Sequence, residues 1–261
     1  MLYFPYYIKI KCTWRSAPVD RASIKQKAQD VLSSQKKPIL QASALFVALI
    51  LVFSVLSFRL TGPSEEEMLR FTDAVMAQDY TAAQEILASV QPPLLETIMS
   101  DLLSCLQGVV AFGFFAMLLK ASRGREVQRG MLLDGFGTLV PVLLLVLLTK
   151  LIVTLGFLLL ILPGIWALYS YRMARYLMIL HPEYSVANCL RLSRLLMRGH
   201  RVELFLLDLS FLGWALLLVI PVVGLAVAVW ALPYWNCSCA LFFEEINAEP
   251  ASPDGNQSPA N

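Results

Sequence analysis

The dominant pattern in this chain is a series of four long segments that are almost free of charged residues. They lie at residues 38–58, 102–119, 138–171 and 209–243, with Lys150 as the single charge in the third. A transmembrane helix needs about 20 consecutive apolar residues, because each residue advances a helix by about 1.5 Å. The first two segments therefore each predict one membrane span, and the last two are long enough for a hairpin of two spans.

Each of the two longer segments contains a proline–glycine break where a hairpin would turn. The breaks are Pro163-Gly164 and Pro221 to Gly224. Proline and glycine interrupt apolar helices because proline lacks an N–H donor and glycine gains little from helical order. The pattern predicts an all-α fold, a polytopic membrane protein with six transmembrane helices at about 39–60, 102–120, 138–161, 165–181, 204–220 and 222–243.

The two predicted hairpins also share a weak sequence echo. Leu155-Gly156-Phe157 precedes the first proline, and Leu212-Gly213-Trp214 precedes the second. Two equivalent hairpins packed side by side would explain the echo, and so would similar apolar composition.

Charged residues alternate in sign from one connection to the next. The segment before the first span and residues 120–129 and 172–201 are basic, whereas residues 61–101 are acidic. Lys and Arg are enriched in cytoplasmic connections of membrane proteins. Six spans with both termini in the cytoplasm satisfy this rule, and five or seven would place one basic connection outside. The expected location is the plasma membrane.

The chain is expected to divide into three parts. Residues 1–38 form a cytoplasmic N-terminal segment, residues 39–246 the membrane domain with an external acidic loop at 61–101, and residues 247–261 a disordered cytoplasmic tail. The N-terminus predicts no secretory signal, because its basic residues leave no apolar core of the required length. Residues 1–20 are interpreted as an extension or as the product of an upstream start codon.

Short amphipathic helices are predicted at both membrane surfaces. In residues 21–35 an apolar stripe is formed by Ile24, Ala28, Val31 and Leu32. In residues 186–198, which Ser185 is expected to cap, the stripe is formed by Val186, Cys189, Leu190, Leu196 and Met197. In the external loop, Ser64 and Glu67 have the spacing of a capping box, and Thr81 is a candidate cap for a second helix.

Composition excludes an ordinary soluble domain. Hydrophobic residues make up 57% of the chain and charged residues 15%, against about 45–50% and about 25% in soluble domains. The net charge of +2 indicates no nucleic-acid partner. No disulfide framework, metal site or cofactor is expected, because Cys237 and Cys239 would point to nearly opposite faces of a helix. No catalytic motif is present, so the protein is interpreted as non-catalytic.

One intramembrane ion pair is a candidate site. Lys150 lies near the middle of the third predicted span, and Asp208 is the one acid within a predicted span. A lysine at mid-membrane costs about 2.5–3.5 kcal/mol on insertion scales, so it should face the bundle interior or water. The hypothesis is a Lys150–Asp208 pair that fixes packing. The alternatives are an ion or proton pathway, or no contact, with Lys150 reaching toward the interface.

Six arginines form a second candidate site, an inner basic rim. They are Arg172, Arg175, Arg191, Arg194, Arg198 and Arg201. The simplest interpretation is the ordinary cytoplasmic bias of basic residues. The sharper hypothesis is recognition of anionic lipid headgroups or of another polyanion, since each basic residue near an anionic leaflet contributes about 1 kcal/mol.

Leu162-Pro163-Gly164-Ile165 is followed by Tyr169-Ser170-Tyr171, and residues 193–214 contain a serine, a Met-basic-Gly step and the run from Leu204 to Trp214. These stretches resemble the turn motif and the longest signature of a bacterial integral-membrane family, domain of unknown function nine-seven-five. Pro233-Tyr234 and Phe242-Phe243-Glu244-Glu245 resemble its closing pattern. The resemblance covers about residues 21–246. It implies the architecture and the membrane location, but no reaction, because the family is functionally uncharacterised.

The leading functional hypothesis is therefore an integral protein of the bacterial cell envelope that contacts lipids, anionic ones included, or that holds a membrane-protein partner or a second copy of the chain. The alternative is a small permease or permease subunit for a small solute or ion. Paired, proline-broken hairpins and intramembrane charges favour this alternative. The absence of a continuous polar stripe along the spans opposes it.

Overall fold

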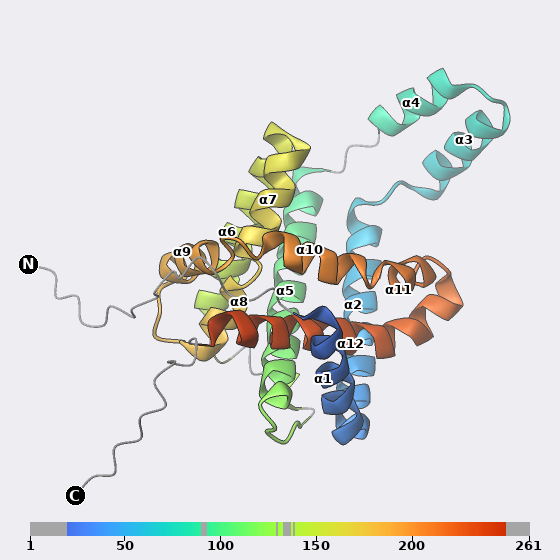
Figure 1. The fold of residues 1–261 in the computed structure, drawn as a ribbon. Coiled ribbons are helices and arrows are strands. Elements are labelled where there is room, and N and C mark those ends of the chain that lie inside the picture. Colours follow the sequence, from blue (N-terminus) through green and yellow to red (C-terminus); the bar gives the residue numbers. More distant parts are fainter. Residues whose placement is uncertain (1–19, 90–92, 129, 133–136, 138, 249–261) are drawn as a thin grey trace, which may run out of the picture.

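The computed structural model consists of helices and short connections over the residues that it describes, which are 20–89, 93–128, 130–132, 137 and 139–248 (Figure 1). The expectations for residues 1–19 and for the tail at 249–261 lie outside this range. The α-helices of the described residues are α1 (Arg21–Ser34), α2 (Lys36–Thr61), α3 (Glu65–Met76), α4 (Tyr80–Ser89), α5 (Leu94–Ser122), α6 (Leu139–Leu159), α7 (Ile161–Tyr171), α8 (Ala174–Leu180), α9 (Val186–Leu196), α10 (Arg201–Leu209), α11 (Leu212–Leu217) and α12 (Pro221–Asn247).

The all-α prediction is confirmed, and the described residues contain no strand. Among the residues that the structure describes, 4 helices could cross a membrane by length and composition: α2, α5, α6 and the Val223–Asn247 part of α12. These apolar helices have the character of membrane spans. The count of six spans and the cytoplasmic placement of both termini remain predictions.

The other two predicted spans are each divided into two short helices. The segment 165–181 breaks between α7 and α8 at Arg172-Met173, and the segment 204–220 breaks between α10 and α11 at Ser210-Phe211. At the second break the N–H of Phe211 donates to the carbonyl of Asp208 at 2.9 Å, a tighter turn than an α-helix makes. Neither break contains proline or glycine, so the sequence pattern did not reveal them.

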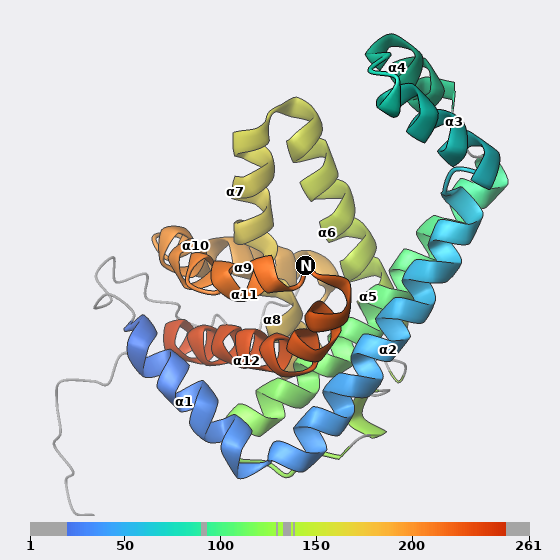
Figure 2. The same cartoon turned by 90° about the vertical axis from the view of Figure 1, so that its right-hand side faces the viewer.

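Two long helices, α2 and α5, run side by side through the molecule, and α12 crosses both of them in each view (Figures 1 and 2). The rings of Phe46 on α2 and Phe114 on α5 stack with centroids 4.3 Å apart. The next residue on α5, Phe115, packs toward Tyr176 of α8, which stacks on Phe243 of α12. These aromatic contacts join α2, α5, α8 and α12.

The apolar stripe predicted for residues 21–35 is confirmed, and it packs against α12. Ile24, Ala28 and Leu32 are buried. Lys25 Nζ donates to the carbonyl of Ser210 at 3.3 Å and lies 4.6 Å from the ring centroid of Phe211. The N-terminal helix therefore covers the break between α10 and α11.

The predicted stripe on α9 is also confirmed. Val186, Cys189 and Leu190 are buried, and Met197 is buried just beyond the helix end. The hydroxyl of Ser185 accepts a hydrogen bond from the N–H of Asn188, so Ser185 is the N-cap, as expected.

The acidic segment forms a helical hairpin, α3 and α4, that projects away from the other helices (Figure 2). The capping box of Ser64 and Glu67 is confirmed. The cap predicted at Thr81 is wrong: Asp79 Oδ1 accepts from the N–H of Ala82 at 3.1 Å and from the Thr81 hydroxyl at 2.6 Å. The loop is also shorter than expected, because α5 begins at Leu94 and includes Asp101.

Protonating Glu67 will weaken the start of α3. Its carboxylate accepts hydrogen bonds from the hydroxyl and the N–H of Ser64, both at 2.7 Å, and these bonds lower the pKa of Glu67. A carboxyl whose pKa is depressed by folding stabilises the fold above its unfolded pKa, and this stabilisation is lost as the pH falls through the folded pKa. Carboxyl ¹³C NMR should give Glu67 a midpoint below that of an unfolded peptide, and Ser64→Ala should raise it. An unchanged midpoint in Ser64→Ala would contradict the cap.

Candidate functional site

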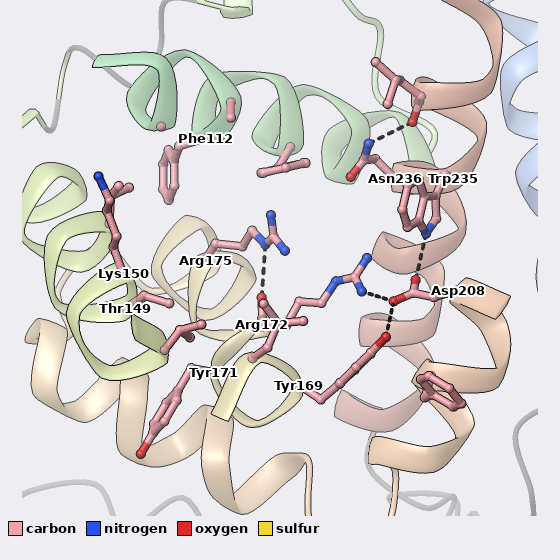
Figure 3. Close-up of a pocket in the computed structure, with 18 of the residues that line it drawn as sticks. Phe112, Thr149, Lys150, Tyr169, Tyr171, Arg172, Arg175, Asp208, Trp235 and Asn236 are labelled. Carbon is pink, nitrogen blue, oxygen red and sulfur yellow. Dashed lines mark hydrogen bonds and ion pairs between the residues drawn. The ribbon is translucent and has the colours of Figure 1, made fainter. Parts of the chain in front are cut away.

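A cavity of about 750 Å³ lies between α5, α6, α7, α8, α10, α11 and α12 (Figure 3). Its walls are mainly apolar and aromatic, with residues such as Phe112, Val146, Phe205 and Leu232. Four charged side chains also line it: Lys150, Arg172, Arg175 and Asp208. An apolar chamber with a few convergent polar groups is the usual form of a small-molecule site.

Asp208 on α10 is the centre of a hydrogen-bond network that joins three parts of the chain. Its carboxylate pairs with the guanidinium of Arg172 and accepts from the hydroxyl of Tyr169 at 3.0 Å. Its other oxygen accepts from Nε1 of Trp235 on α12 at 2.7 Å. The side chains of Arg172 and Asp208 are only 13% and 12% exposed. The pair is therefore buried and both carboxylate oxygens are satisfied, which a buried charge requires.

Arg172 occupies the break between α7 and α8. Beyond its bond to Asp208, its Nη2 lies 3.3 Å from Sγ of Cys239. The guanidinium also lies 5.8 Å from the ring centroid of Trp235 and 6.0 Å from that of Tyr169. Asp208 belongs to α10, and Cys239 and Trp235 belong to α12, so these contacts hold the broken helix against two neighbours.

Arg175 on α8 lies in the cavity next to this pair (Figure 3). Its Nε donates to the carbonyl of Arg172 at 3.0 Å, and its guanidinium stacks 4.2 Å from the ring centroid of Phe115. Helix breaks leave carbonyls without an intrahelical partner, and Arg175 satisfies one of them. No carboxylate in the described part of the chain pairs with Arg175.

The predicted pair of Lys150 and Asp208 is wrong. Lys150 Nζ instead contacts Asp101 Oδ1 at 2.7 Å and Ser104 Oγ at 2.9 Å, and the lysine side chain is 46% exposed. The reason is the early start of α5, which places Asp101 on a helix packed against α6. Lys150 therefore links α6 to α5, while Asp208 forms its ion pair with Arg172.

The six arginines do not form one continuous rim. Arg172 and Arg175 line the interior cavity, whereas Arg191, Arg194 and Arg198 are exposed on or just beyond α9. Arg201 is half-buried and its Nε donates to the Ser170 hydroxyl at 2.9 Å. The interior placement of two arginines corrects the prediction of a single surface for all six.

Two of the four outer arginines lie beside one aromatic ring. The guanidinium carbons of Arg201 and Arg194 lie 4.3 Å and 5.2 Å from the ring centroid of Trp166. We call Arg191, Arg194, Arg198, Arg201 and Trp166 the basic face. Burial and the nearby charges of Arg194 and Arg198 lower the pKa of Arg201. The last cause reflects a high local density of positive charge.

Within the residues that the structure describes, no cluster of three or more His, Cys, Asp or Glu side chains is arranged for a metal ion. Cys237 and Cys239 are both buried as free thiols on α12. One of them, Cys239, contacts Arg172, a role that the sequence did not indicate.

Sequence reasoning missed Tyr169, Trp235, Asp101 and Phe115 as members of the site. One signal could have pointed to the true pair: Arg172 lies deeper in its predicted span than Arg175, so it reaches water less easily and needs an internal partner.

A profile of the family described as Protein of unknown function (DUF975) matches residues 151–250. The expected resemblance is confirmed over that range, which contains the 193–214 signature together with Arg172, Arg175 and Asp208. Residues 21–150 of the expected resemblance lie outside the match. Comparisons with curated proteins and with solved structures gave no match.

Proposed function

From the family match over residues 151–250 and the membrane character of the apolar helices, we propose that this chain is a non-catalytic, multi-pass protein of the bacterial plasma membrane that contacts anionic lipids on the cytoplasmic side. The matched family is itself of unknown function, so the proposal depends on the geometry of the basic face.

The observation that carries the proposal is a group of four arginines without a carboxylate partner, two of which lie beside an exposed tryptophan. No ion pair to a carboxylate joins Arg191, Arg194, Arg198 or Arg201 among the described residues. Trp166 is 43% exposed, and tryptophan is typical of the membrane–water interface. Since the apolar stripe of α9 packs on the protein, its arginines face outward, where each would gain about 1 kcal/mol from an anionic leaflet.

Reversing three charges of the basic face should remove the lipid preference. The variant Arg191→Glu/Arg194→Glu/Arg198→Glu is expected to lose its enrichment of phosphatidylglycerol over phosphatidylcholine, measured by native mass spectrometry after gentle extraction from mixed vesicles. The matched variant with three glutamines keeps the side-chain size and should give an intermediate result. Equal phosphatidylglycerol enrichment in wild type and the glutamate variant would overturn the proposal.

The rival proposal, a small permease, has one observation in its favour. The breaks in two predicted spans, at Arg172-Met173 and Ser210-Phe211, adjoin a cavity lined by Lys150, Arg172 and Asp208. Discontinuous helices beside a central site are typical of transporters. Against it, three of the four charged groups of the cavity already lie in ion pairs. Labelling of a cysteine at Ala215 by an impermeant thiol reagent from both membrane sides would favour the permease.

A further inference from the structure

We propose that the cavity between α5–α8 and α10–α12 binds a single-chain amphiphile with one acidic head group, and that Arg175 of α8 is the head-group ligand. This inference goes beyond the lipid contact proposed above, because the ligand lies inside the helical domain and not on the basic face. It depends on three properties of the cavity: the balance of charge along its walls, the unused hydrogen-bond donors of Arg175, and its volume.

After the ion pairs are counted, one positively charged side chain of the cavity has no carboxylate partner. Arg172 is neutralised by Asp208, and Lys150 is neutralised by Asp101. Arg175 has no carboxylate partner in the described part of the chain. A charge that is largely withdrawn from water is costly unless it is paired. One monoanionic group would complete the pairing, whereas a cation or a dianion would leave an imbalance.

The guanidinium of Arg175 is oriented to receive that group. Its Nε is fixed by the carbonyl of Arg172, and Phe115 packs against its face at 4.2 Å. No hydrogen bond from its two terminal amino groups to a described residue is present, and no side-chain nitrogen or oxygen that is fully buried in the described residues lacks a partner. The terminal amino groups therefore open to the cavity. A guanidinium donates two parallel hydrogen bonds to a carboxylate or phosphate, and a held orientation lowers the entropy cost of binding.

The rest of the chamber suits an acyl chain. Away from the arginines its wall is formed by apolar side chains, among them Val146, Val153, Leu209, Leu212 and Leu232. At about 30 Å³ for each water-sized group, a chain of sixteen carbons fills roughly 500 Å³ and two such chains exceed the cavity of about 750 Å³. The volume therefore favours a fatty acid or a similar single-chain acid over a two-chain phospholipid.

The test uses the full chain in nanodiscs with a photoactivatable palmitic acid. We expect light-induced labelling of cavity residues on α5 and α12, and we expect competition by palmitic acid but not by hexadecanol, which has the same chain and no charge. Arg175→Gln should weaken binding roughly tenfold or more, because it removes a charge-assisted bond. Arg191→Gln, on the basic face, should leave binding unchanged.

Two outcomes would overturn the inference: equal competition by hexadecanol, or labelling confined to exposed apolar residues outside the cavity, such as Val55 and Leu158. The competition experiment needs no variant, so it stands even if Arg175→Gln does not fold. The triple glutamate variant of the basic face distinguishes a failure of this inference from a failure of the proposed surface contact with anionic lipids. If it retains cavity labelling but loses phosphatidylglycerol enrichment, the internal site and the surface contact are independent.

Discussion

Replacing Asp208 with leucine will destabilise the protein far more than replacing Lys150 with methionine. Asp208 neutralises Arg172 and also accepts from Tyr169 and Trp235, and both charged side chains are largely buried. Removal of one partner leaves the guanidinium without compensation in an apolar interior. Breaking a buried pair in this way costs about 3–5 kcal/mol.

The lysine variant is the matched control. Lys150 pairs with Asp101, but the two side chains are 46% and 66% exposed. An exposed ion pair contributes about 0–1 kcal/mol. The free energy of unfolding, measured by reversible denaturation in mixed micelles, should therefore change little in Lys150→Met. Equal losses in the two variants would contradict the assignment of partners.

Substituting alanine for Gly164 will destabilise the helical hairpin that α6 and α7 form (Figure 2). A Cβ at Gly164 would lie 2.4 Å from Cγ of Phe157, and a Cβ at Gly156 would lie 3.0 Å from Cα of Gly164. Cγ is the ring atom nearest the backbone, so it has little freedom to move. Overpacking of this kind costs about 1–3 kcal/mol, which the same unfolding assay will detect.

Gly213 provides the control, and it also tests the sequence echo between the two predicted hairpins. A Cβ at Gly213 meets no atom within 4 Å, so Gly213→Ala should be neutral or slightly stabilising, because alanine favours a helix. In the sequence echo Gly213 corresponds to Gly156, where a Cβ would lie 3.0 Å from Cα of Gly164, so these two glycines occupy different environments despite their similar sequence. A loss of stability in Gly213→Ala as large as that in Gly164→Ala would contradict the open surroundings of Gly213.

Features that depend on local periodicity could be predicted from the sequence. The all-α class, the buried stripes of α1 and α9, and the caps at Ser64 and Ser185 all follow from spacing within one helix. The breaks at Arg172 and Ser210 could not be predicted in this way. Neither has proline or glycine, and the first is held by Asp208 and Arg175, which only the tertiary fold brings to it.

In the candidate site too, the sequence indicates which residues matter but not which residues contact one another. The sequence indicates Lys150 and Asp208 as charges that need an explanation inside an apolar segment, but it places Arg172 in the inner basic rim. It could not choose among the possible partners, because that choice depends on where α5 begins and on how α7, α10 and α12 meet. Arg175 was grouped with the surface arginines, since a guanidinium near a span end can reach the interface from sequence position alone.

The central claim is that Arg172 and Asp208 form the ion pair of the cavity, and a double-mutant cycle tests it most directly. Arg172→Met, Asp208→Leu and their combination should give a coupling energy of at least about 1 kcal/mol, with the double variant more stable than the sum of the single losses predicts. The corresponding cycle for Lys150→Met and Asp208→Leu should be additive within about 0.5 kcal/mol. Additivity in the Arg172 cycle, or clear coupling in the Lys150 cycle, would contradict it.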